Sequence, residues 1–130
     1  PNLPEAAKLL GRAQAHTTDD VAEQAHALLA LGAKAVLMKG GHATGDVCTD
    51  FLFTASTQRA FGAPRIATRN THGTGCSYSS AIAARLALGE PLEQSVETAP
   101  AWLHNAIQSA DTLDVGTGHG PVHHFHEMWT

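Results

Sequence analysis

The sequence predicts an α/β fold, and three observations lead to this class. An apolar run at 35–38 has the length of a short buried strand. Two further segments, at 51–53 and up to Phe61, read as paired strands around a polar turn. Helical patterns precede and follow these strands, and strands combined with helices in this way indicate α/β architecture. The length of 130 residues suits about one domain, which we expect to span 1–130.

Two helices are expected before the first strand. Pro4 suits the first turn of a helix, where its missing N–H costs nothing, and Gly11 is a plausible end of that helix. Thr18 is a good N-cap for the second helix, because acidic residues follow it near the positive end of the helix dipole. Gly32 is the predicted end of the second helix. The buried strand at 35–38 then follows.

A loop at 40–46 separates this strand from the predicted strand pair, whose polar turn lies near 56–58. A stretch rich in glycine and hydroxyl residues, at 70–77, leads into a helix of small side chains that Gly89 ends.

The last helix is expected to begin at Pro91. Pro100 predicts a kink or a break within it, because an interior proline costs a helix about 3 kcal/mol. The tail at 116–122 reads as a loop.

Composition excludes several classes of protein. Eight Lys and Arg against twelve Asp and Glu give a net charge of −4, which argues against a nucleic-acid platform. No apolar run approaches the roughly 20 residues that span a bilayer, and no signal peptide is visible. The two cysteines form no CxxC pair, so we expect free thiols in a reducing, cytoplasmic setting.

The glycine-rich stretch has the pattern of an anion site. Gly73, Thr74, Gly75 and Cys76 stand at the head of a helix, where unpaired N–H groups and the helix dipole attract negative charge. The stretch contains neither GxxxxGK[ST] nor GxGxxG, so it is neither a P-loop nor a dinucleotide fingerprint. On spacing alone, a purely structural turn remains the alternative.

Cys76 is a candidate base or nucleophile, because the start of a helix favours the thiolate. The alternative is a small buried core residue, which is the commoner fate of a free cysteine. Cys48 lacks such a context and is expected to be structural. The tail holds four histidines without a recognised zinc spacing, so we expect them to be solvated or locally hydrogen-bonded: His119, His123, His124 and His126.

The stretch at 70–76, with 63–66 before it, resembles the signature of the hydroxymethylpyrimidine/phosphomethylpyrimidine kinases. These are the thiamine-pathway members of the ribokinase-like family. Four other segments agree with that family in order: 1–6, 36–42, 50–52 and 118–122. The resemblance runs to about residue 125. It covers only the C-terminal half of the family's length.

The resemblance implies a ribokinase-like, three-layer α/β/α fold, of which this chain is the second half of the central sheet with its flanking helices. Residues 1–130 would then be the C-terminal half of a single kinase domain, with the N-terminal half absent. The implied activity is ATP-dependent phosphorylation of a hydroxymethyl aminopyrimidine and of its monophosphate. No nucleic acid or membrane is expected as a partner. A homo-oligomer, or association with the missing half, is expected to cover the exposed sheet.

The resemblance also assigns roles to individual residues. The backbone at Gly73, Thr74, Gly75 and Cys76 would form the anion hole for the transferring phosphoryl group, and Cys76 would accept the hydroxyl proton where many relatives have Asp.

Four further positions complete the implied machinery. The pair Asn2 and Glu5 would organise Mg²⁺ through water, Lys39 would neutralise nucleotide phosphates, and Thr71 would line that site. Glu5 as a simple first-turn carboxylate and Lys39 as a solvated strand end are the alternatives.

Two other functions stay open. One is a pyridoxal or pyridoxine kinase, because close relatives accept such rings and most of the substrate pocket lies in the absent half. The other is a nucleotide-binding fragment that is catalytically incomplete. The sequence departs from the family pattern at Arg69, where Lys is usual, and at Pro100, in the helix that helps to wall the adenine site.

Overall fold

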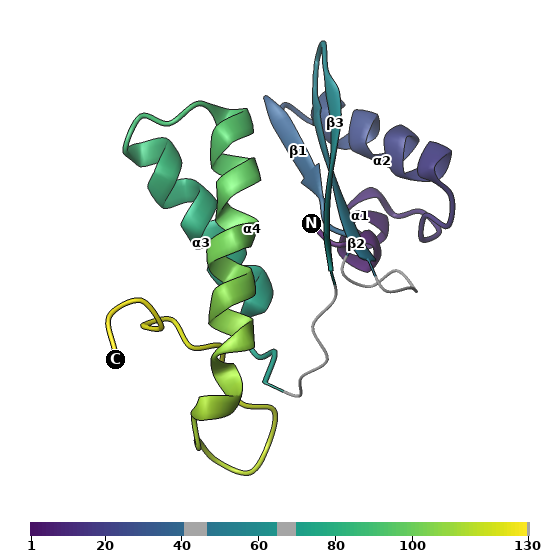
Figure 1. Cartoon of the computed structure of the whole chain (residues 1–130). Helices are drawn as coiled ribbons and strands as arrows, with labels where there is room; N and C mark the ends of the chain where they lie inside the picture. The colour runs from purple at the N-terminus through teal and green to yellow at the C-terminus, as the bar shows by residue number, and fades with distance from the viewer. Residues whose placement is uncertain (41–46, 65–69, 130) are drawn as a thin grey trace. The chain divides into compact units, whose positions relative to one another are not determined.

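The computed structural model describes residues 1–40, 47–64 and 70–129, and the chain divides into two compact units (Figure 1). The first unit, Pro1–Arg65, contains two helices and a three-stranded sheet. The second, Ile66–Thr130, contains two long helices and a short 3₁₀ helix. The α/β class predicted from the sequence is confirmed.

Helices α1 (Leu3–Leu10) and α2 (Thr18–Ala30) both begin with a capping box. The predicted end of α1 is confirmed, since Gly11 stands at its C-cap with a left-handed φ of 62°. The predicted N-cap of α2 is wrong by one residue: Thr17 is the cap, and its hydroxyl accepts the N–H of Asp20 at 3.1 Å. Thr18 cannot close the same box, because the residue three positions after it is Val21, which has no acceptor.

The Asp20 carboxylate makes the start of α2 sensitive to acid. It accepts the N–H groups of His16 at 3.0 Å and Thr17 at 2.9 Å, and these bonds lower the pKa of Asp20 below its ordinary value of 3.8. The stabilisation is therefore complete above the unfolded-state pKa and is lost as the pH falls through the lower folded-state pKa.

We expect the difference in melting temperature between the wild type and Asp20→Asn to shrink as the pH falls from about 6 to about 2. Thermal unfolding followed by circular dichroism across that range measures it. Asp19→Asn, at the neighbouring position on α2, is the matched control. A difference for Asp20→Asn that stays constant with pH would contradict the assignment.

The sheet has the order β1–β2–β3 and is antiparallel throughout. Its strands are β1 (Ala35–Met38), β2 (Val47–Thr54) and β3 (Gln58–Pro64). The predicted strand at 35–38 and the predicted strand pair with its polar turn are confirmed. Most of the predicted loop at 40–46 lies outside the described residues.

The core of the first unit lies between the sheet and its two helices. Alternation along β1 buries Val36 and Met38, and Val36 stands opposite Phe53 on β2. These three residues pack with apolar residues of α1, of α2 and of the turn between them: Ala6, Ala15, Val21, Ala25 and Leu28. Both helices therefore cover the same face of the sheet, as Figure 1 shows.

The second unit is built on α3 (Thr74–Ala87) and α4 (Leu92–Gln108), which pack against each other and are followed by η1 (Ala110–Thr112). Gly89, with a φ of 88°, follows α3 as predicted. Of the kink or break predicted at Pro100, a break does not occur, because α4 continues through it. The buried residues Val96, Ala99 and Ala106 hold α4 in place on both sides of the proline. Within the described ranges, no helix is both long enough and apolar enough to cross a membrane.

Candidate functional site

Residues 73–76, which we call the glycine turn, begin α3. Gly73 is the N-cap and has a left-handed backbone, with φ 82° and ψ 4°, that glycine adopts without steric cost. The turn is closed by two backbone bonds. Thr74 N–H donates to Thr71 O at 3.3 Å, and Ser77 N–H donates to Gly73 O at 2.8 Å. The sequence prediction that these four residues stand at the head of a helix is confirmed.

Three amides of the glycine turn remain open among the described residues, those of Gly73, Gly75 and Cys76, and the last two lie in the first turn of α3. Unpaired N–H groups are expected in the first turn of a helix. The Cys76 side chain is exposed, so the alternative of a buried core cysteine is wrong. Unpaired amides at the positive end of a helix can bind an anion. The sulfur of the accessible thiol beside them can receive a proton.

A short C-terminal segment, residues 120–124, runs directly against the glycine turn. Gly120 N–H donates to the Asn70 Oδ1 at 3.2 Å, and His72 N–H donates to Gly120 O at 3.1 Å. The contact is so close that a Cβ at Gly120 would collide with the Asn70 side chain. Asn70 also donates to Ala110 O at 3.2 Å, which links the segment before the turn to η1. We call residues 120–124 the C-terminal brace.

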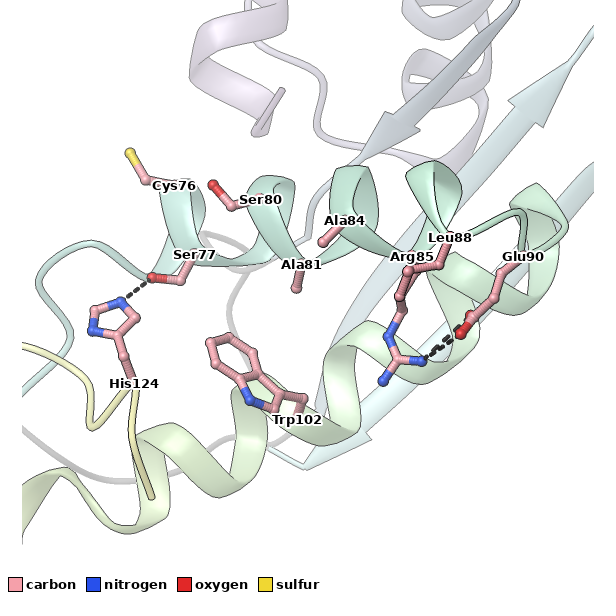
Figure 2. Close-up of a pocket in the computed structure, with 10 residues that line it drawn as sticks. All are labelled: Cys76, Ser77, Ser80, Ala81, Ala84, Arg85, Leu88, Glu90, Trp102 and His124. Carbon is pink, nitrogen blue, oxygen red and sulfur yellow. Dashed lines mark hydrogen bonds and ion pairs between the residues drawn. The ribbon is translucent and has the colours of Figure 1, made fainter. Parts of the chain in front are cut away.

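A pocket of about 580 Å³ lies beside the glycine turn in the second unit (Figure 2). The ion pair of Arg85 and Glu90, at 3.1 Å, borders one end. The other end is bordered by Ser77, whose hydroxyl faces the His124 ring, with 2.7 Å between Ser77 Oγ and His124 Nε2. The Trp102 indole lies between the two ends. The full lining is Cys76, Ser77, Ser80, Ala81, Ala84, Arg85, Leu88, Glu90, Trp102 and His124.

One of the tail histidines contradicts the sequence prediction, and a second, exposed as predicted, makes a distant contact that the sequence did not indicate. His123 is buried rather than solvated, and its backbone N–H donates to Ala106 O on α4 at 2.9 Å. His124 bonds to Ser77 across 47 residues, so its partner is not local. No spacing in the sequence signals such a contact. His126 does bond locally, through its Nδ1 and the carbonyl of His123, as predicted.

Three of the residues expected to serve Mg²⁺ and nucleotide lie in the first unit. Asn2 caps α1 by accepting the Glu5 N–H at 2.8 Å, while the Glu5 carboxylate accepts the Asn2 N–H at 2.7 Å. Lys39 forms a parallel β-bridge with Asn2, and its N–H donates to Pro1 O at 2.8 Å. The backbone therefore brings Asn2, Glu5 and Lys39 to one end of the sheet.

The donor set at Asn2 and Glu5 fits magnesium. Carboxylate and amide oxygens are the ligands that this ion prefers. A carboxylate offers about four lone-pair sites, so the bond from the Asn2 N–H is compatible with binding a metal or its water. Among the described residues, no group of three or more His, Cys, Asp and Glu side chains forms a cage for a metal. Mg²⁺ typically keeps several waters and binds through one or two carboxylates together with substrate phosphates.

The strand end that carries Lys39 is fixed by its neighbour. Gly40 N–H donates to the Asp50 carboxylate at 2.8 Å, and a Cβ at Gly40 would collide with the Thr49 carbonyl. Two of the segments that carry the family resemblance, at 36–42 and 50–52, are therefore in direct contact. Thr71, the other residue expected at the nucleotide, belongs to the second unit and is exposed beside the glycine turn.

Comparison with known families gives a match over nearly the whole chain. Residues 1–123 match the family described as phosphomethylpyrimidine kinase. The hydroxymethylpyrimidine/phosphomethylpyrimidine kinases of Rhizobium meliloti and Escherichia coli are 54% and 51% identical over 129 residues. Each match covers 99% of this chain and 48% of the relative, so the chain spans about half the length of these proteins.

Solved structures give the same result for the fold. The ADP complex of Bacillus subtilis pyridoxal kinase is similar with a TM-score of 0.88 and 31% sequence identity. The match covers 100% of this chain and 48% of that one. The predicted ribokinase-like fold is thereby confirmed.

Proposed function

Because the chain belongs to the phosphomethylpyrimidine kinase family, we propose that it supplies the C-terminal half of a kinase domain in thiamine biosynthesis. The reaction moves the γ-phosphoryl group of ATP to the hydroxymethyl oxygen of an aminopyrimidine, and a second transfer phosphorylates the resulting monophosphate. The observation that carries this proposal is the glycine turn, where two unpaired amides open α3 beside an exposed thiol.

The glycine turn performs the phosphoryl-transfer step. The substrate oxygen bonds to the γ-phosphorus, and the bond to the bridging oxygen breaks, which releases ADP. Backbone N–H groups in the turn, above all those of Gly75 and Cys76, stabilise the charge on the transferring group. The Cys76 sulfur receives the hydroxyl proton. Such a reaction depends on position and charge more than on covalent chemistry, and those are the properties that a rigid helix start provides.

The cofactors of the proposed reaction are ATP and Mg²⁺. Asn2 and Glu5 would hold the metal through water, Lys39 would neutralise nucleotide phosphates, and Thr71 would contact the nucleotide. When bound, Mg²⁺ neutralises phosphate charge. The ADP bound to the B. subtilis structure supports the nucleotide assignment.

The other partners in the proposal follow from the fact that this chain spans about half the length of its relatives. The aminopyrimidine is the small-molecule substrate, and the other half of the domain provides most of its pocket. Association with that half, or a homo-oligomer, completes the sheet. Neither nucleic acid nor membrane enters the proposal. Two free cysteines suit a reducing compartment, which favours a cytoplasmic location.

A pyridoxal kinase is the second candidate activity. The observation in its favour is the similarity to the B. subtilis pyridoxal kinase over the full length of this chain. Sequence identity favours the pyrimidine, since the two pyrimidine kinases are 54% and 51% identical whereas the pyridoxal kinase is 31% identical. The third reading, a catalytically incomplete nucleotide-binding fragment, applies to the chain when it is alone.

A chimera tests the proposal. This chain replaces the matching segment of the E. coli relative, and ADP release is measured with hydroxymethylpyrimidine, its monophosphate and pyridoxal. We expect turnover with both pyrimidines within about tenfold of the E. coli enzyme, because the transferred residues include the whole glycine turn. The isolated chain should release no ADP. A folded chimera that binds ATP without consuming it would overturn the proposal.

A further inference from the structure

We propose that His124 is a positioning residue for the glycine turn, through its hydrogen bond to Ser77. This inference rests on the proposed function, because it assigns a task in phosphoryl transfer to a side chain outside the anion hole. The imidazole does not touch the reacting atoms. It holds the first turn of α3 so that the Gly75 and Cys76 amides keep their direction.

The C-terminal brace contacts the glycine turn on both flanks. On the N-terminal flank, His72 N–H donates to Gly120 O at 3.1 Å. On the C-terminal flank, the Ser77 hydroxyl and His124 Nε2 are 2.7 Å apart (Figure 2). The two contacts come from residues only four apart in the brace, so one short segment fixes the separation of the two ends of the turn.

The brace itself is anchored to the rest of the second unit. Val122 and His123 are 1% and 7% exposed, and the His123 N–H donates to the Ala106 carbonyl on α4 at 2.9 Å. The backbone next to His124 is therefore fixed by the burial of Val122 and His123 and by a hydrogen bond to α4. An anchored segment can transmit position to the residue that its side chain binds.

Ser77 passes this constraint to the turn. Its N–H donates to Gly73 O at 2.8 Å, which is the first hydrogen bond linking the helix to its N-cap. Ser77 is buried, whereas Cys76 beside it is exposed. In Figure 2 the two side chains leave the helix in different directions, Ser77 toward His124 and Cys76 to the side away from Trp102. Because the Ser77 N–H is bonded to Gly73 O, a shift of Ser77 also moves the amides of the turn. The Cys76 side chain points in another direction, so this shift breaks no contact of the thiol.

The His124 ring is exposed, so it contributes little to the core. Its removal should leave folding nearly intact while it loosens the turn. Misplacement of a catalytic group by about 1 Å can cost about 100-fold in rate, and the cost falls on the transition state more than on ground-state binding. The effect of His124 should therefore appear in kcat rather than in KM for ATP.

Four variants in the chimera test this inference. His124→Ala and Ser77→Ala are each expected to lower kcat about tenfold, with KM for ATP changed less than about twofold. The double variant should be no worse than either single one, because both remove the same bond. His124→Gln should restore kcat to within about threefold, since a glutamine amide can donate to the Ser77 hydroxyl. His104→Ala, on α4 and outside the pocket lining, is the control.

A second measurement, on the 130-residue chain alone, is independent of catalysis. Amide hydrogen exchange at Ser77, whose N–H is bonded to Gly73 O, should be faster in His124→Ala and normal in His124→Gln, with the melting temperature unchanged. Unchanged exchange, or losses in kcat that multiply in the double variant, would overturn the role of His124. A wild-type chimera that does not turn over refutes the proposed function instead, and the exchange result then decides alone whether His124 positions the turn.

Discussion

Replacing Cys76 with serine is expected to lower kcat about 100-fold in the chimera, with the dissociation constant for ATP nearly unchanged. The thiol stands at the start of α3, exposed, beside the two unpaired amides. A serine hydroxyl has a similar size but does not ionise near neutral pH, so it cannot receive the proton of the substrate hydroxyl. The backbone amides remain, so the phosphate is still bound.

The second cysteine provides a matched control. Cys48 lies in β2, in the first unit, and has no place in the proposed chemistry. Cys48→Ser should leave kcat within about threefold of the wild type. ADP release measures kcat, and isothermal titration calorimetry measures ATP binding. Equal turnover in Cys76→Ser and the wild type would remove Cys76 from the mechanism, whereas loss of ATP binding would assign it a structural role.

The largest loss of stability is expected for Phe53→Ala. The Phe53 ring is fully buried at the centre of the core between the sheet and its helices, opposite Val36 and 5.8 Å from the His26 ring, centroid to centroid. Truncation of such a ring leaves a cavity and costs about 3–5 kcal/mol of unfolding free energy. That loss is a large part of the roughly 5–15 kcal/mol typical of a whole protein.

Urea denaturation of the 130-residue chain, followed by far-UV circular dichroism, measures this loss. Leu9→Ala is the control, because the Leu9 side chain is 65% exposed on α1 and its truncation should cost less than about 0.5 kcal/mol. A loss below about 1 kcal/mol for Phe53→Ala would show that the core relaxes into the cavity.

Local chemistry made much of the fold predictable. Gly11, Gly89 and the apolar run at 35–38 act within a few residues, so their consequences follow from short patterns. The predicted N-cap of α2 was one residue too late, because Thr17 and Thr18 have equal N-cap propensity. Only the capping-box partner, Asp20, distinguishes them. Pro100 was expected to kink or break α4. The helix does not break, because the local cost of the proline is outweighed by the packing of buried residues on both sides.

The candidate site was likewise predictable where it depends on residues close together in the sequence. The start of α3 at the glycine turn follows from the glycines themselves, since Gly73 needs a left-handed backbone. The bond between Ser77 and His124 joins residues 47 positions apart and depends on how the brace folds back. The contact of Gly40 with Asp50 and Thr49 is likewise tertiary. Residue spacing in the sequence does not predict such tertiary contacts. The family resemblance therefore identified those segments but did not show which contacts join them.

The division of the chain into two units has a spectroscopic consequence. Both tryptophans, Trp102 and Trp129, and the single tyrosine, Tyr78, belong to the second unit. Intrinsic indole fluorescence therefore reports on that unit alone, and the first unit is silent. A fluorescence transition that coincides with the dichroism transition would show that the two units melt together. A separation of the two curves would reveal that each unit melts on its own.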